Sequence, residues 1–240
     1  MPESGFKGPI FSIIIPSYNE EETLPISIPD LLKHLGEAEI SDFELLIVDN
    51  GSFDKTGDVI RELMGKDRRI RSVRVPFNQG WGLGVMSGCS QALGRYVVYM
   101  CADLQVPHKA LVEVCERIAR EDSDKVIVKV NRVVRDDGVA RGISSNLYNL
   151  FINLMFLGVS PDVNGTPKAL SLKLWRQLDV RNRGSFTDTE VLIKAKRANA
   201  RIIEIETVSV KRICGSSTVR ISQLPFEMFF DAIKFRLNIT

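Results

Sequence analysis

The chain has 240 residues, which is enough for one large domain or two small ones with a buried core. Its 32 basic and 30 acidic residues leave a net charge of +2 without a basic stripe, so nucleic acid is not an expected partner. The longest apolar stretch, 147–159, is too short to span a bilayer and is interrupted by Asn149 and Asn153. No signal-peptide pattern is present, and we expect a cytoplasmic protein whose four cysteines are free thiols.

The first half of the chain alternates short apolar runs with segments of helical pattern. Strands are predicted at 11–16, 43–50, 70–76, 95–103 and 124–132. The segments between them are predicted to be helical, with Asp54 as an N-cap and Gly94 as a C-cap. Strands separated by helices of this length are typical of parallel βαβ units. We therefore expect an α/β fold with a mainly parallel central sheet flanked by helices.

The second half is less regular, and it contains no internal repeat or obvious linker. Helices are expected over 144–158 and 186–199, a strand followed by a turn over 166–175, and a strand over 201–212. We expect residues 1–220 to form a single domain. Residues 221–240 are expected to form an amphipathic helix, which carries Phe226, Phe229, Phe230, Phe235, Lys234 and Arg236. Such a helix fits a membrane surface, a membrane partner subunit or its own domain.

Polar side chains stand where the predicted strands of the first half end. They are Ser17, Tyr18 and Asn19 after the first strand, Asp49 and Asn50 at the end of the second, Asn78 after the third, and Asp103 and Gln105 after the fourth. Ligands of parallel sheets bind at the carboxyl ends of the strands. The sequence therefore predicts a polar cleft at this edge of the sheet.

The chemistry of these strand ends fits a nucleoside diphosphate. Tyr18 and Glu20 can hold a base by stacking and hydrogen bonding, and Asp49 can accept from a base N–H or a ribose hydroxyl. Asp103 and Gln105 offer the hard oxygen ligands that Mg²⁺ or Mn²⁺ prefers, and such an ion would bridge phosphates.

Two other interpretations compete with this one. Residues 49–52 also form a good turn sequence, and Asp103 also fits a solvated loop. Alternatively, 80–88 is a glycine loop that cradles a dinucleotide, with Asp103 about 20 residues later as the ribose-binding acid. The glycine spacing from Gly82 departs from that motif, and the polar strand ends at Tyr18 and Asp49 would then have no role.

Several stretches of the sequence resemble the motifs of a known family. The stretches SIIIPSYNEEETL, ELLIVDNGSFDKT, NQGWGLGVMSGCSQALGRYVVYMCADLQVP and VKVNRV look like successive motifs of family 2 glycosyltransferases with the GT-A fold. DVNGTPKALSLKLW and FTDTEVLIKAKRANARIIEIETVSVKRICGSST continue in the same order. Within the family, the sequence is most similar to the dolichyl-phosphate mannosyltransferase and polyprenyl-phosphate glycosyltransferase branch.

The resemblance implies a role for each matching residue. The nucleotide-sugar pocket would contain Pro16, Tyr18, Glu20, Asp49, Asn50, Ser52, Asn78, Gly80, Ala102 and Asp103. The metal ligands would be Asp103 and Gln105. The catalytic set would be Asp103, Arg132, Arg141, Asp188, Glu190 and Arg212, in which the arginines grip the acceptor phosphate and the donor diphosphate.

Two positions depart from the family pattern. Cys101 stands where the family motif DADLQ begins with aspartate, and Asn50 stands where the family often carries aspartate. A protonated thiol is a poor ligand for a hard cation, so we expect weak binding of Mg²⁺ or Mn²⁺. An active enzyme with reduced metal dependence is the leading interpretation, and a non-catalytic homologue that binds a nucleotide sugar is the alternative.

Two acceptors for the sugar of a UDP- or GDP-linked donor remain open. A sugar hydroxyl needs a general base, for which Asp188 and Glu190 are candidates. A polyprenyl phosphate is already anionic and needs cations such as Arg132 and Arg141, while 143–159 can line a lipid channel or be a buried helix. We favour polyprenyl phosphate, with inversion as the family implies and peripheral contact with the cytosolic face of a membrane.

Overall fold

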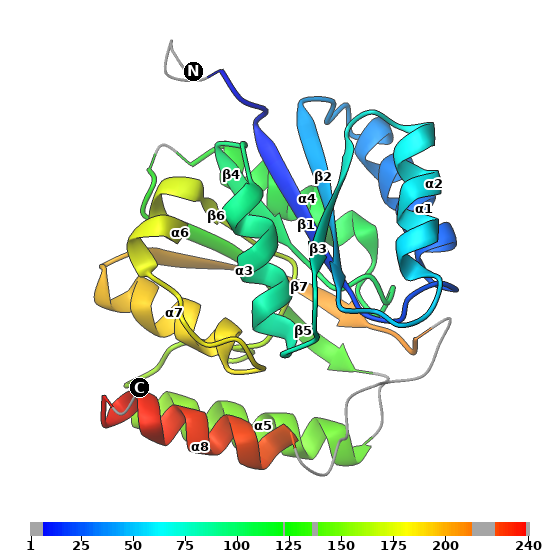
Figure 1. The fold of residues 1–240 in the computed structure, drawn as a ribbon. Coiled ribbons are helices and arrows are strands. Elements are labelled where there is room, and N and C mark those ends of the chain that lie inside the picture. Colours follow the sequence, from blue (N-terminus) through cyan, green and yellow to red (C-terminus); the bar gives the residue numbers. More distant parts are fainter. Residues whose placement is uncertain (1–6, 122, 136–138, 213–223, 239–240) are drawn as a thin grey trace.

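The computed structural model describes residues 7–121, 123–135, 139–212 and 224–238. In this part of the chain, a seven-stranded sheet has the order β3-β2-β1-β4-β6-β5-β7 (Figure 1). Its strands are β1 (Phe11–Ser17), β2 (Phe43–Asn50), β3 (Ile70–Val75), β4 (Tyr96–Tyr99), β5 (Val126–Arg135), β6 (Lys168–Ser171) and β7 (Arg201–Ser209). Only β6 is antiparallel to its neighbours β4 and β5. The predicted mainly parallel sheet is confirmed.

Helices cover both faces of this sheet. They are α1 (Leu24–Glu37), α2 (Thr56–Lys66), α3 (Trp81–Gln91), α4 (His108–Ala119), α5 (Val139–Met155), α6 (Leu172–Leu178), α7 (Thr187–Arg197) and α8 (Leu224–Arg236). Apolar residues of α1, α2 and α4 pack on one face, and those of α3, α5, α6, α7 and α8 form the core on the other. In β1, Ile13 and Ile15 belong to the first core and Ile14 to the second, because side chains alternate along a strand.

Four local expectations were wrong. The N-cap of α2 is Lys55 and not Asp54, although Asp54 Oδ1 accepts from the Thr56 nitrogen at 2.9 Å. α3 ends at Gln91, and Gly94 is not its C-cap; a Cβ at Gly94 would lie 2.5 Å from the Ser12 nitrogen, so glycine permits close approach to β1. β4 ends at Tyr99, earlier than predicted. The expected turn after β6 is a helix, α6, whose N-cap Ser171 accepts a hydrogen bond from the Leu174 nitrogen at 3.0 Å.

α5 and α8 lie side by side across the end of the sheet where the parallel strands finish (Figure 1). The Phe229 ring of α8 lies 5.5 Å from Tyr148 and 4.6 Å from Phe151 of α5, measured between ring centroids. The predicted C-terminal helix is therefore present from Leu224 and packs on the chain itself; residues 221–223 and the side chain of Phe226 lie outside the described part. None of the described helices has both the length and the apolar character needed to cross a bilayer.

A substitution at Gly88 would test the close contact between α3 and the sheet. A Cβ at Gly88 would overlap Ile14 Cγ2 and lie 3.1 Å from Val48 Cγ2, both in the core of the sheet. We expect Gly88→Ala to lower the free energy of unfolding by about 1–3 kcal/mol, because the core must shift to accept the methyl group. Urea unfolding measures this change.

The matched control is Gly65→Ala in α2, where an added Cβ meets no atom within 4 Å. That variant should be neutral or stabilised by up to about 1 kcal/mol, since alanine is the better helix former. Equal unfolding midpoints for the two variants would contradict the packing described for α3.

Candidate active site

The loops that follow β1 and β2 are tied together at the edge of the sheet. Ser17 and Asp49 are register partners at the ends of these strands. The buried Asp49 carboxylate accepts from the Ser52 nitrogen at 2.9 Å, and the Ser52 hydroxyl accepts from the Asn19 nitrogen at 3.0 Å. The Tyr18 ring stands next to the loop. The structure therefore brings the polar ends of the two strands into one place, as predicted.

Glu20 and Arg212, which are far apart in the sequence, form an ion pair beside these loops. The Glu20 nitrogen donates to the Thr56 hydroxyl at 2.8 Å, which fixes the backbone at the entrance to α1. Within the described part of the chain, Glu20 Oε2 is buried and accepts no hydrogen bond. Buried acceptors normally have partners, so this oxygen is available to a ligand donor.

Asn50 and the glycines after β3 hold α3 against the sheet. The Asn50 amide donates to the Gly80 carbonyl at 3.0 Å, and the Gly80 nitrogen donates to Asn78 Oδ1 at 2.8 Å. Gly80 has φ +108°, and a Cβ at Gly84 would lie 2.8 Å from Pro16 Cβ. Protein atoms already occupy the space next to Gly80 and Gly84. Residues 80–88 therefore do not form the open loop that a dinucleotide needs.

The metal residues predicted from the sequence line a cavity of about 40 Å³ together with Arg132. The other lining residues are Met100, Cys101, Val106 and Thr166. Asp103 Oδ1 accepts from the Gln105 nitrogen at 3.2 Å, which shapes the loop after β4. The Gln105 carbonyl accepts from the Val210 nitrogen at 2.8 Å, so the end of β7 anchors the same loop. Ala102, the other residue predicted in this loop, is buried.

Cys101 lies in this cavity as a neutral thiol. Burial raises its pKa well above the ordinary value, and the charges of Asp103 and Asp188 raise it further. Asp103 is the single carboxylate among the residues lining the cavity. The donor set is thus one carboxylate, one amide and one uncharged sulfur, which fits a hard divalent ion only when phosphate oxygens and water complete its coordination.

Arg132 is fixed at the edge of the cavity by Asp162. Its Nε and one terminal nitrogen each donate to a different Asp162 oxygen at 2.8 Å, and its backbone nitrogen also donates to Oδ2 at 3.1 Å. A bidentate pair of this kind orients the guanidinium strongly. Arg141 belongs to the first turn of α5, and its side chain lies outside the described part.

Asp188 is buried outside the lining of the cavity, and its carboxylate already has three donors. Its carboxylate accepts from Lys168 Nζ at 2.6 Å, from Trp81 Nε1 at 2.9 Å and from the Tyr99 hydroxyl at 3.3 Å. Burial lowers the pKa of Lys168, although the charge of Asp188 opposes this shift. A carboxylate held in this way has little freedom to take a proton from a substrate.

Glu190 also faces the interior. It accepts from the backbone nitrogens of Arg181 at 3.1 Å and Asn182 at 2.7 Å, and it pairs with Lys194 at 2.7 Å. These contacts attach the loop before α7 to the helix. The structure thus groups Asp103, Gln105 and Arg132 in one cavity and sets Glu190 apart from it.

The partners that position these groups were not predicted from the sequence. Asp162 orients Arg132, and Lys168, Tyr99 and Trp81 hold Asp188. Each of these residues stands in an apolar or turn-like segment, where the local pattern does not indicate a functional role. The one feature that could have drawn notice is Lys168, a lysine within a predicted strand.

Solved structures with a similar fold include complexes with UDP. Glucosyl-3-phosphoglycerate synthase from Mycobacterium tuberculosis, in complex with Mn²⁺, UDP and glucosyl-3-phosphoglycerate, matches with TM-score 0.73 and 19% identity over 97% of this chain and 81% of that one. Its complex with Mg²⁺ and UDP gives TM-score 0.74 with the same identity and coverage. The fold of the present chain is therefore GT-A-like.

The sequence comparison assigns the family. The profile of glycosyl transferase family 2 matches residues 12–178, so the chain belongs to that family. The glycosyltransferase AglD of Haloferax volcanii is 28% identical over 198 residues, which is 80% of this chain and 32% of that protein. The undecaprenyl-phosphate 4-deoxy-4-formamido-L-arabinose transferase of Proteus mirabilis is 29% identical over 209 residues, 86% of this chain and 61% of that protein. The chain thus spans only part of the length of these relatives.

Cys101→Asp tests whether the thiol limits metal binding. We expect the variant to bind Mn²⁺ roughly tenfold more tightly than the wild type in the presence of UDP or GDP, because it adds a second charged oxygen ligand. Isothermal titration calorimetry measures the change. Cys101→Ser, which stays neutral and similar in size, is the control and should not tighten binding; an equal effect of both variants would refute the argument.

Two buried lysines lie opposite each other in the sheet next to the cavity. Lys129 of β5 and Lys168 of β6 are register partners, and neither is exposed. Lys129 Nζ donates to the Ser160 hydroxyl at 3.2 Å and lies 3.5 Å from Glu204. Burial, reinforced by the charge of Lys168, lowers the pKa of Lys129 to about 8.

This pKa predicts a pH dependence of stability. Between pH 8 and the ordinary lysine pKa, the unfolded chain holds a proton on Lys129 that the folded chain has lost. The unfolding free energy of the wild type should therefore rise with pH in this window, relative to Lys129→Met, by up to about 3 kcal/mol. The exposed Lys125→Met is the control and should follow the wild type; a parallel curve for Lys129→Met would show that Lys129 titrates normally.

Proposed function

We propose that this chain transfers a sugar from a nucleoside-diphosphate sugar to a polyprenyl phosphate. The observation that carries the proposal is the grouping of Asp103, Gln105 and Arg132 around one cavity at the carboxyl end of the sheet. The polar loops after β1 and β2 stand at the same edge. This arrangement offers a site for the nucleobase, a site for the diphosphate and an oriented cation along one edge of the sheet.

The donor nucleotide would lie along the strand ends. The unpaired Oε2 of Glu20 suits a donor from the base or ribose, and Asp49 stands at the end of the neighbouring strand. Arg212, paired with Glu20, adds positive charge for the diphosphate. The similar solved structures contain UDP, which supports a nucleoside diphosphate as the ligand class.

Asp103 and Gln105 would hold Mg²⁺ or Mn²⁺. When bound, such an ion neutralises the charge that develops on the departing diphosphate. Because Cys101 is neutral, we expect the protein to bind this ion weakly until the diphosphate contributes its own oxygens.

The acceptor assignment follows from which groups are committed elsewhere. Asp188 and Glu190, the two candidate bases for a hydroxyl acceptor, are both buried and hydrogen-bonded to internal donors. A phosphate acceptor needs no base, only a cation that positions it, and Arg132 lines the cavity. The name of the Proteus mirabilis relative states undecaprenyl phosphate as that protein's acceptor, which supports the same class here.

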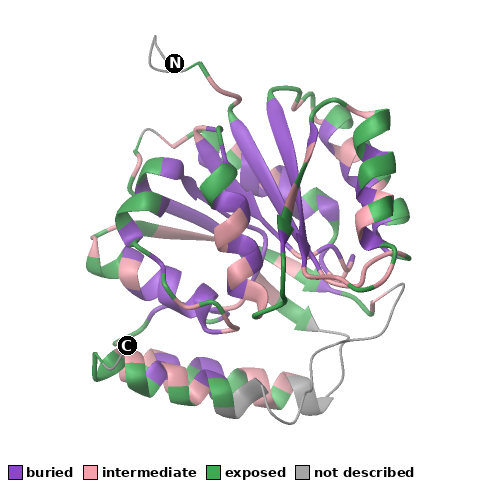
Figure 2. Cartoon of the chain, in the orientation of Figure 1, coloured by how far each residue is buried: buried purple, intermediate pink, exposed green. Residues whose placement is uncertain are grey.

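An apolar surface on α5 and α8 also supports a lipid acceptor. Ile143, Leu147, Leu150 and Leu154 recur at helical spacing on α5 and are 57–72% exposed. Phe230, Ile233 and Leu237 form a second exposed row, and the exposed Lys234 and Arg236 add positive charge to α8. Figure 2 shows exposed segments on this helix layer, which lies across the carboxyl end of the sheet. We propose that this face rests on an anionic membrane.

The neutral thiol at Cys101 favours a second candidate function. With one carboxylate at the metal position, the protein could bind a nucleotide sugar without transferring the sugar. Turnover with a lipid extract separates the two functions, because only an enzyme forms product.

The test combines donor binding with product formation. UDP- and GDP-sugars are titrated with and without Mn²⁺ on the wild type, Asp103→Ala and the control Asp58→Ala, a surface change on α2. Radiolabelled donor is then incubated with native membrane extract. We expect metal-dependent binding that weakens at least about tenfold in Asp103→Ala only, and label in the lipid phase.

Three other results would contradict the proposal. Binding without any labelled product would establish the non-catalytic homologue. Label in a water-soluble glycan would establish a hydroxyl acceptor. Absence of nucleotide-sugar binding would remove the donor site itself.

A further inference from the structure

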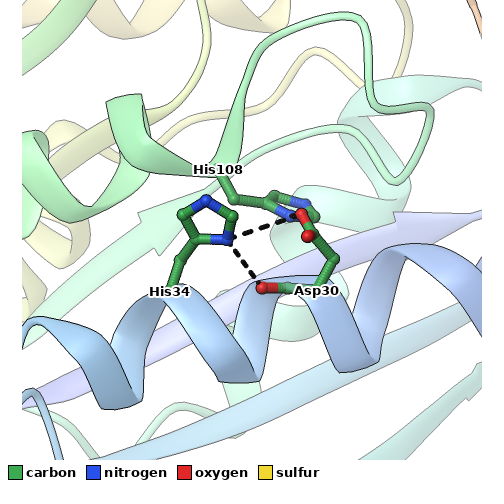
Figure 3. A group of neighbouring side chains, drawn as sticks. All are labelled: Asp30, His34 and His108. Atoms are coloured by element: carbon green, nitrogen blue, oxygen red, sulfur yellow. Dashed lines mark hydrogen bonds and ion pairs between the residues drawn. The ribbon is translucent and has the colours of Figure 1, made fainter.

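The chain contains only two histidines, and both lie in one cluster outside the cavity. His34 belongs to the last turn of α1, and Asp30 stands one turn earlier on the same helix. His108 is the first residue of α4. Figure 3 shows the two imidazoles and the carboxylate converging between the two helices.

We propose that Asp30, His34 and His108 form a binding site for a divalent transition metal ion such as Zn²⁺. His108 Nδ1 lies 2.7 Å from Asp30 Oδ2, and His34 Nδ1 lies 3.5 Å from the same oxygen. One ligand atom from each residue lies within 4.8 Å of the others. Ligands at zinc bond lengths of about 2.0–2.1 Å in a tetrahedron are roughly 3.3 Å apart, so only small side-chain movements are needed.

The ligand types select the class of ion. Two imidazoles and one carboxylate suit Zn²⁺, Co²⁺ or Ni²⁺, whereas Mg²⁺ prefers oxygen ligands alone. His108 is buried, while His34 and Asp30 are partly exposed, so one side of the site is open to water as a further ligand. Burial of His108 lowers its pKa despite the neighbouring Asp30, and the neutral imidazole is the form that binds metal.

Two hydrogen bonds must yield to the ion. In the structure, Asp30 Oδ2 is hydrogen-bonded to His108 Nδ1, and the Asp30 carbonyl accepts from His34 Nδ1 at 2.9 Å. Metal binding through Nδ1 needs the tautomer in which each neutral imidazole carries its proton on Nε2, so both hydrogen bonds are given up while each ring keeps one proton. A purely hydrogen-bonded cluster is the competing description, and it predicts no metal affinity.

The two helices that carry the site each follow a loop at the carboxyl end of a strand. α1 follows the loop that contains Tyr18 and Glu20, and α4 follows the loop that contains Asp103 and Gln105. An ion held between Asp30 and His34 on one helix and His108 on the other would join α1 to α4. It would therefore fix the start of α4, directly after the loop of Asp103 and Gln105, against the C-terminal half of α1.

The test titrates Zn²⁺ and Co²⁺ into untagged, metal-free protein without nucleotide. We expect one equivalent to bind, to raise the melting temperature, and to give a Co²⁺ spectrum of nitrogen and oxygen ligation without a thiolate band. His34→Gln should weaken binding at least about tenfold, equivalent to about 1.4 kcal/mol. Lys33→Gln, an exposed neighbour on α1, and Asp103→Ala should bind as the wild type does.

Histidine NMR provides a second measurement that needs no variant. Because the chain has two histidines, both sets of ring signals must shift together as one equivalent of Zn²⁺ is added to the wild type. Unchanged ring signals, a thiolate band in the Co²⁺ spectrum, or equal affinity of His34→Gln and the wild type would each overturn the proposal.

Discussion

The buried ion pair between Lys168 and Asp188 is the interaction on which the candidate active site rests. It joins β6 to α7, and the same carboxylate accepts from Trp81 of α3 and Tyr99 of β4. Removing one partner of a buried pair typically costs about 3–5 kcal/mol, because a charge stays buried without compensation. Tyr99 and Lys168 lie two residues from Cys101 and Thr166, which line the cavity, so the network fixes the strands next to two lining residues.

The contacts of Asp188 also bear on which chemistry is open to the candidate site. A carboxylate that receives three hydrogen bonds is a structural anion, so the site is left with Asp103, Gln105 and the clamped Arg132. Arg132 carries positive charge, and Asp103 and Gln105 offer oxygen ligands for a cation, which agrees with the anionic acceptor proposed above. The proposed histidine site between α1 and α4 has nitrogen ligands, so the two proposed sites would prefer different classes of metal ion.

Local sequence patterns predicted much of the fold because buried segments need apolar residues at the positions that face the core. The continuous apolar run at 11–16 and its counterpart at 43–50 became central strands buried on both faces. Errors occurred where a residue's role depends on a distant neighbour. Gly94 was predicted to be a helix cap, but a glycine is needed there because β1 passes close to it. β6 runs antiparallel to its neighbours, and the types of its four residues do not indicate strand direction.

The sequence by itself determined most of the strands and helices along the chain, the polar strand ends and the family motifs, because these depend on residues close together in the chain. Only the tertiary structure decided that Arg132 is clamped by Asp162, that Asp188 and Glu190 are held by internal donors, and that His34 meets His108. Each of these facts is a contact between residues from different elements. Such contacts are set by how helices pack on the sheet, and no local pattern of residues encodes them.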